Sequence, residues 1–517
     1  MKYIEILDCT LRDGEQTSGV SFLPHEKLVI ARKLLRDVNV DRIEVASARV
    51  SEGERDAVKA ICRYARQIGR LDRVEVLGFV DGHRSADWIA ACGGRVINLL
   101  AKGSLRHCTG QLGKTPEQHI ADVSDEIEYA CAQGMTVNVY LEDWSNGMVS
   151  SPEYVYLLMD SLLRHTSACR DGQQGGRLAR FMLPDTLGVM NPLQVVECMR
   201  KMKKRYPDCH FDFHAHNDYD LAVSNSLAAV LSGAAGLHVT VNGLGERCGN
   251  APMASVQAIL KDQFGATTAI DESQLNDVSR LVEAYSGIAI APNQPIVGDN
   301  VFTQVAGVHA DGDNKDKLYQ NALMPERFGR KREYALGKTS GKANIAMNLE
   351  ELGLELTPEQ TRRVTQRITE LGDRKEQVTR DDLPYIVSDV LKHDAPEHKV
   401  KLINYVVSTA YGLKPGANIR VEINGRQYEA GATGDGQYDA FVKALRFIYK
   451  KYLGRTFPLL HNYAVTIPPG GRTDALVQTV ITWRADDGSL IRTRAVDADQ
   501  TEAAIKATFK MLNMIET

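Results

Sequence analysis

Apolar, β-branched runs and amphipathic stretches alternate along the first half of the chain. Each run predicts a strand, and each following stretch has the 3.6-residue period of a helix with one buried face. Several predicted helices carry a proline in the first turn, as helix starts commonly do. Strands are expected near residues 3–9, 42–48, 74–80, 96–101, 136–143, 180–186, 210–216 and 236–242. Helices are expected near 24–38, 52–68, 84–92, 115–133, 152–164, 192–205, 220–233 and 252–264.

Eight strand–helix units in succession predict an α/β fold of the (β/α)8 barrel type over residues 1–265. A doubly wound sheet also alternates strands with helices, so alternation alone does not decide between them. The count of eight favours the barrel. No Gly-rich GxGxxG turn follows the first strand, which argues against a dinucleotide-binding sheet.

The second half of the chain has a different pattern. Residues 266–395 are predicted to form mostly helical linker subdomains. From 396 to 517 the composition turns to strands, with a weak internal repeat: strand-rich 399–431 precedes a helix near 437–452, and strand-rich 462–496 precedes a helix near 499–513. We therefore expect a C-terminal α+β domain built from two βββα units.

Composition narrows the class of protein. Of the 517 residues 43% are hydrophobic, which excludes disorder as the main state, and the net charge of −4 gives no basic field for nucleic acid or anionic lipid. The nine scattered cysteines form no CxxC pair, which is typical of thiols in a reducing compartment. No apolar run reaches about 18 residues, and the residues at the start of the sequence predict a strand and not a signal peptide. We expect a soluble cytoplasmic protein with no membrane or nucleic-acid partner.

Candidate chemistry is expected where barrel strands end, because the βα loops there carry the active sites of such barrels. The first strand ends in a polar segment that contains Arg12 and Asp13. One interpretation is a solvated loop with an internal ion pair. The other is a metal-binding carboxylate, Asp13, beside an arginine that polarises a substrate oxygen.

Two histidines end the seventh strand. His214 and His216 lie two residues apart, so their side chains point to the same face. They form either a divalent-metal pair or a hydrogen-bonded pair at the rim. The Gly-rich turn after the eighth strand brings Asn250, which offers an amide oxygen. Because strands one, seven and eight adjoin in a closed barrel, Asp13, His214, His216 and Asn250 are predicted to share one cation with open positions.

Three more polar residues occupy strand ends. Glu44 lies in an otherwise apolar strand, where an unpaired carboxylate is costly, and Arg12 is the expected partner. Glu142 is a candidate general base, or a carboxylate that orients a ligand. Thr186 is a candidate for holding a substrate carboxylate, or a helix cap.

Three segments together resemble the family of metal-dependent Claisen-condensing acyltransferases, the 2-isopropylmalate, citramalate and homocitrate synthases. They are residues 11–16 (LRDGEQ), 214–218 (HAHND) and 243–250 (GLGERCGN). The resemblance implies that acetyl-CoA condenses with a 2-oxo acid on a divalent ion (Mn, Zn or Mg). Its ligands would be Asp13, His214, His216 and Asn250. It also implies catalytic roles for Arg12, Glu44 and Glu142. Glu142 matches the family position of the base, and His309 is the alternative base.

The identity of the 2-oxo acid depends on the pocket for its side chain. The matching positions are Leu77, Leu100 and Tyr140, which are bulky, leave room for the methyl group of pyruvate and crowd an isopropyl group. The closest resemblance is therefore to citramalate synthases of isoleucine biosynthesis. The alternative is a 2-isopropylmalate synthase of leucine biosynthesis. No basic residue at these positions suits a dicarboxylic 2-oxo acid.

The same resemblance covers the second half. It implies that His309 and Tyr319 act over the partner subunit's barrel in a homodimer, and that 396–517 bind a branched-chain amino-acid effector through the loop at 467–475. The loop near 166–176 is expected to be a surface insertion. Two competing interpretations are a hydroxymethylglutaryl-CoA lyase, which lacks the βββα pair, and an amino-acid sensor with an inactive barrel, which the retained site residues disfavour.

Overall fold

The computed structural model describes most of the chain, and it divides into two compact units. The first unit holds the described residues up to 304 and from 317 to 333, and the second holds those from 334 onwards. The described residues are 2–170, 175–304, 317–318, 320–334, 336, 342–351, 356–373, 378, 383–391, 399–466, 477–486, 488 and 490–516.

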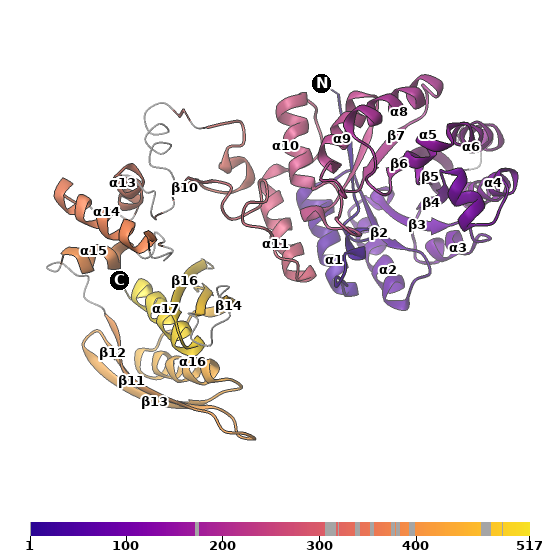
Figure 1. Ribbon diagram of the computed structural model, residues 1–517. Helices are drawn as coiled ribbons and strands as arrows, with labels where there is room; N and C mark the ends of the chain where they lie inside the picture. The colour runs from indigo at the N-terminus through magenta and orange to yellow at the C-terminus, as the bar shows by residue number, and fades with distance from the viewer. Residues whose placement is uncertain are drawn as a thin grey trace. The chain divides into compact units, whose positions relative to one another are not determined.

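The first unit is a barrel of strands with helices around it (Figure 1). Its eight parallel strands close in sequential order, as predicted, because β1 pairs with both β2 and β8. The strands are near-continuous apolar runs because a parallel barrel buries both faces of its sheet. They are β1 (Glu5–Asp8), β2 (Arg42–Ser47), β3 (Val74–Phe79), β4 (Val96–Lys102), β5 (Thr136–Glu142), β6 (Arg177–Asp185), β7 (Phe211–Ala215) and β8 (Gly236–Val239).

Helices surround the barrel and present apolar stripes to it. In α2, for example, Ala57, Ile61 and Ala65 are buried at helical spacing. Helix α4 begins with a capping box between Thr115 and Gln118, which satisfies backbone N–H groups at its start. The helices are α1 (Pro24–Arg32), α2 (Glu52–Gln67), α3 (Arg84–Ala91), α4 (Pro116–Ala132), α5 (Trp144–Ser150), α6 (Pro152–His165), α7 (Ser167–Arg170), α8 (Pro192–Arg205), α9 (Ala222–Leu231), α10 (Met253–Phe264) and α11 (Leu275–Ser286).

Beyond the barrel come two short strands, β9 (Thr303–Gln304) and β10 (Glu333–Tyr334), and then three helices with a small core of their own. These helices are α13 (Lys342–Glu351), α14 (Pro358–Asp373) and α15 (Leu383–Leu391). The predicted linker region thus contains helices, as expected.

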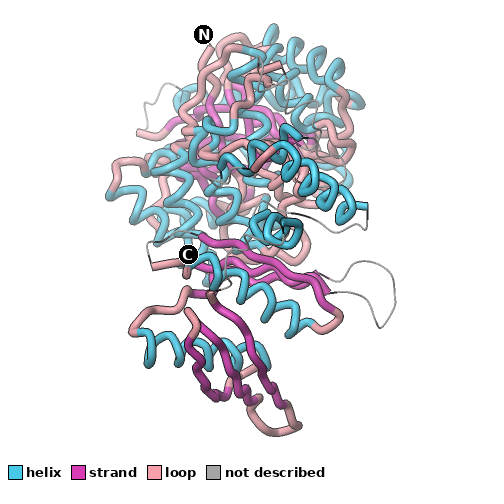
Figure 2. Tube along the Cα trace, turned by 90° about the vertical axis from the view of Figure 1, so that its left-hand side faces the viewer, coloured by secondary structure: helices cyan, strands magenta, loops and turns pink. Residues whose placement is uncertain are grey.

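The C-terminal part contains the two predicted βββα units, each with an antiparallel three-stranded sheet (Figure 2). One apolar core, which includes Phe441, Trp483 and Met511, joins the sheets and helices of both units. The first βββα unit consists of β11 (Val400–Ser408), β12 (Gly416–Ile423), β13 (Arg426–Thr433) and α16 (Gln437–Ile448). The second βββα unit consists of β14 (Leu459–Thr466), β15 (Val477–Arg484), β16 (Leu490–Asp497) and α17 (Gln500–Ile515).

None of the helices in the described part of the chain combines the length and the apolar character that crossing a membrane requires.

Candidate active site

Four side chains from three adjacent strand ends meet at the mouth of the barrel. The Nε2 atoms of His214 and His216 lie 3.3 Å apart, and they are 3.5 and 3.8 Å from Oδ2 of Asp13. Asn250 Nδ2 donates to Asp13 Oδ1 at 3.0 Å. All four residues are buried. The structure therefore brings together the four residues that the sequence singled out for a metal site.

The charges of this cluster suit a cation. Burial alone would raise the pKa of Asp13, but Arg12 and His214 outweigh it and hold that pKa well below its usual value. Burial lowers the pKa of His214, and burial together with His214 lowers the pKa of His216 to about 4. At neutral pH both imidazoles are therefore neutral and Asp13 is charged. These are the protonation states in which such groups coordinate metal ions.

The backbone around Asn250 explains how this side chain reaches the cluster. Asn250 forms an isolated antiparallel bridge with His216, and its amide nitrogen also donates to the carbonyl oxygen of Leu244 at 3.1 Å. Gly245 has φ +157°, a conformation that glycine alone adopts readily. The buried Oδ1 of Asn250 has no hydrogen-bond partner among the described residues. A buried amide oxygen in that state is available as a metal ligand.

Arg12 is held from three sides. Its Nε donates to Oε2 of Glu44 at 2.6 Å, which confirms the expected pairing, and its Nη1 donates to Oδ2 of Asp13 at 2.9 Å. Its Nη2 donates to the hydroxyl of Tyr140 at 3.3 Å. Asn98 also donates to Glu44, at 2.7 Å. A guanidinium has five N–H donors, so this clamp fixes the group and leaves donors for a substrate.

Glu142 has a partner that sequence reasoning missed. Lys102, the last residue of β4, forms an ion pair with Glu142, the last residue of β5, and only a quarter of the Glu142 side chain is exposed. Lys102 lies two residues after Leu100 and so projects to the same side of the strand. The alternation of side chains along a strand, which predicted that His214 and His216 meet, could also have placed Lys102 on the side of the strand that faces the site.

The three predicted pocket residues lie in one cluster. Leu77, Leu100 and Tyr140 pack together with Leu7, Cys9, Phe79 and Met182 inside the barrel. The Tyr140 ring faces Arg12, whose Cζ is 5.7 Å from the ring centroid. The apolar cluster therefore adjoins the guanidinium and the metal-ligand candidates.

The remaining predicted residues are placed differently. The hydroxyl oxygen of Thr186 accepts a hydrogen bond from the N–H of Asp143 at 2.9 Å, so this side chain braces the end of β5 and is not the cap of α8, whose N-cap is Asn191. His309, Tyr319 and the loop at 467–475 lie outside the described residues, as do residues 171–174 of the predicted insertion.

Models of known families match this chain in three consecutive segments. The HMGL-like model matches residues 3–282, the homocitrate synthase post-HMGL domain-like model matches 296–376, and the LeuA allosteric (dimerisation) domain matches 377–516. The first covers more than half of the chain. The chain belongs to the HMGL-like family.

Full-length relatives place it more narrowly, in the group that contains citramalate and 2-isopropylmalate synthases. A putative (R)-citramalate synthase of Methanopyrus kandleri is 34% identical over 99% of this chain and 96% of its own length. A probable 2-isopropylmalate synthase of the same organism is 36% identical over 99% and 98%. The (R)-citramalate synthase of Methanocaldococcus jannaschii is 33% identical over 99% of both chains. Among solved structures, the HMG-CoA lyase of Bacillus subtilis matches 57% of this chain and 97% of its own at 20% identity, with a TM-score of 0.48.

Proposed function

We propose that this enzyme condenses acetyl-CoA with pyruvate, giving citramalate and CoA. The observation that carries the proposal is the meeting of Asp13, His214, His216 and Asn250 beside the clamped Arg12, in a chain that matches citramalate synthases over its whole length. This combination supplies what a Claisen condensation needs: a place to bind a 2-oxo acid and donors for the oxygen that gains negative charge.

The four clustered residues fit a divalent ion, since they offer two neutral imidazoles, a carboxylate and a buried amide oxygen. We assign them as its ligands, with Mn, Zn or Mg as candidates. When bound, the ion acts as a Lewis acid on the 2-oxo acid.

Arg12 donates N–H groups to the ketone oxygen of the 2-oxo acid as that oxygen becomes an alkoxide. Glu44 and Asp13 hold the guanidinium in place for this role. Glu142 removes a proton from the acetyl methyl group, and its ion pair with Lys102 holds the carboxylate at the end of β5. The new C–C bond joins that methyl carbon to the ketone carbon.

The oxygen that was the ketone then takes up a proton, and water cleaves the thioester to a carboxylic acid and free CoA. We propose His309 and Tyr319 as the residues that assist proton transfer, and Thr186 as a contact for the substrate carboxylate. These three assignments rest on the family resemblance.

The apolar cluster supports pyruvate as the 2-oxo acid. Leu77 and Tyr140 are buried and Leu100 is half-buried, and we expect these bulky side chains beside Arg12 to crowd a branched side chain. The second candidate substrate is 2-oxoisovalerate, which the full-length similarity to a probable 2-isopropylmalate synthase favours. We further propose a homodimer with a branched-chain amino-acid effector bound by the C-terminal domain, because that segment matches the LeuA allosteric (dimerisation) domain.

Release of CoA from acetyl-CoA tests the proposal, with pyruvate, 2-oxobutanoate and 2-oxoisovalerate compared under the same conditions with Mn²⁺. We expect the highest kcat/KM with pyruvate. The variant Leu100→Ala is the matched test of the pocket, since it shortens one side chain of the wall, enlarges the pocket and changes no charged group. It should shift the preference toward 2-oxoisovalerate by about tenfold or more. Wild-type preference for 2-oxoisovalerate would contradict pyruvate as the substrate while keeping the chemistry.

A further inference from the structure

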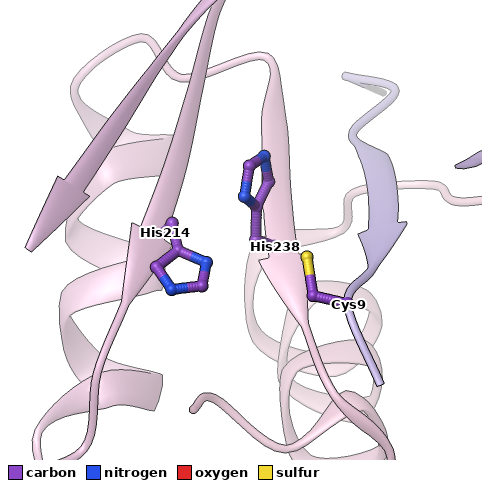
Figure 3. Close-up of side chains that lie close together, drawn as sticks. All are labelled: Cys9, His214 and His238. Carbon is purple, nitrogen blue, oxygen red and sulfur yellow. The ribbon is translucent and has the colours of Figure 1, made fainter. Parts of the chain in front are cut away.

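A second group of potential metal ligands lies beside the first. Cys9, which follows β1, comes close to His214 on β7 and His238 on β8, and their ligand atoms all lie within 4.8 Å of one another (Figure 3). All three residues are buried. The hydrogen bonds of His238 argue against a second metal site. Its Nδ1 lies 3.1 Å from the Tyr140 hydroxyl and its Nε2 lies 3.4 Å from Oδ2 of Asp212, so both nitrogens are engaged.

The direction of these bonds follows from Asp212. Burial alone would raise the pKa of Asp212, but Arg42 and Arg180 hold it well below its usual value, so this residue is a carboxylate and can only accept. Arg42 donates to it at 2.5 Å. His238 therefore donates its Nε2–H to Asp212. With this N–H on Nε2, the Nδ1 atom on the other side of the ring is the atom that faces the Tyr140 hydroxyl, at 3.1 Å.

Tyr140 has one hydroxyl hydrogen and two nearby acceptors. One is Nδ1 of His238 at 3.1 Å, and the other is Oε2 of Glu44 at 3.3 Å, which already accepts from Arg12. Because Glu44 lies farther away and already accepts from Arg12, the geometry favours Nδ1 of His238 as the acceptor of this hydrogen. The hydroxyl oxygen then turns a lone pair toward Nη2 of Arg12, which donates to it at 3.3 Å.

We propose that His238, oriented by Asp212, is a positioning residue for Arg12 that acts through the hydroxyl of Tyr140. The bonds run in one direction, from Arg12 to Tyr140 to His238 to Asp212, and they link the site at the barrel mouth to the ion cluster of Arg42 deeper in the barrel. This series of hydrogen bonds fixes Nη2 of Arg12, and the remaining N–H groups of the guanidinium donate to the substrate. This inference rests on the proposed condensation.

Two variants of His238 separate positioning from packing. His238→Leu removes both bonds, whereas His238→Gln keeps an oxygen that accepts from Tyr140 and an amide that donates to Asp212. We expect His238→Leu to lower kcat about tenfold, the effect of losing one oriented hydrogen bond, with the KM for acetyl-CoA unchanged. His238→Gln should restore most of kcat. Equal losses in both variants would overturn the proposal.

A double-mutant cycle with Tyr140→Phe identifies the route. If His238 acts only through the hydroxyl, His238→Leu should have no further effect on kcat once Tyr140 is Phe. Independent, multiplying losses would overturn the proposal. The same cycle measured by urea unfolding tests the Tyr140–His238 bond without turnover, and additive effects there would also overturn it. A wild-type enzyme that releases no CoA with any of the three 2-oxo acids would instead refute the proposed function, whatever the unfolding cycle shows.

Discussion

Replacing Gly245 with alanine tests the metal site without removing any of its ligands. The backbone of Gly245 passes so close to Asn250 that a Cβ atom there would be 3.1 Å from the Asn250 side-chain carbon Cγ and closer still to its nitrogen. The same atom would be 3.0 Å from Oδ1 of Asp13. Favourable contacts between such atoms begin near 3.5 Å, so Asn250 must move by an amount on the order of 1 Å.

Such a shift separates two of the four proposed ligands. It breaks the 3.0 Å hydrogen bond between Asn250 and Asp13, which holds both side chains in place. Loss of support of this kind typically weakens metal binding by about 10- to 100-fold, or about 1.4–2.8 kcal/mol. Because φ at Gly245 is +157°, the substitution also strains the backbone by roughly 1–3 kcal/mol. We therefore expect weaker Mn²⁺ binding together with a modest loss of stability.

Calorimetric titration of the metal-stripped protein with Mn²⁺ gives the affinity, and CoA release gives kcat. The matched control is Gly265→Ala, since Gly265 has φ +57° and nothing within 4 Å of the added methyl group. The control should lose stability through backbone strain and keep its metal affinity. An unchanged Kd and kcat in Gly245→Ala, with the fold verified by circular dichroism, would refute the assignment of Asn250 and Asp13 as ligands.

Three further predictions follow from the same structure. Chelation with EDTA should abolish CoA release and leave far-UV circular dichroism unchanged, and activity that survives chelation would refute the metal site. Glu142→Gln should lower kcat by about 10²- to 10⁴-fold at saturating acetyl-CoA. A variant that keeps nearly full kcat would contradict Glu142 as the base and point to His309, which the variant His309→Ala then tests. Burial lowers the pKa of His119 to about 4 from 6.5, so the unfolded state takes up the proton first and stability falls as the pH drops from 6.5 toward 4. Between pH 8 and pH 5 the free energy of unfolding should fall by about 2 kcal/mol because of His119. Urea unfolding of wild type and His119→Gln at both pH values measures this contribution. An equal pH dependence in the two proteins would contradict it.

Local sequence patterns were sufficient for the barrel and for part of the site. Eight apolar runs with helical stretches between them predicted the eight parallel strands, because a barrel repeats one local unit. The spacing of His214 and His216 predicted that their side chains would meet, because alternate residues of a strand share a face. The polar residue Glu44 in an apolar strand predicted its pairing with Arg12, since β1 and β2 are neighbours in any such barrel.

Other contacts depend on strand register and on which residues share one level of the barrel. Lys102 and Glu142 meet because β4 and β5 pair in the register that sets these two residues side by side. The link from Tyr140 to His238 crosses the barrel from β5 to β8, between residues 98 positions apart in the sequence. Strand order alone does not specify such a contact, because the tilt and stagger of the closed barrel decide which inward side chains face each other. The sequence by itself therefore determined the elements, the residues at strand ends and the pairing of Arg12 with Glu44. Only the tertiary structure decided the contact of Arg12 with Tyr140 and His238 and the pairing of Glu142 with Lys102.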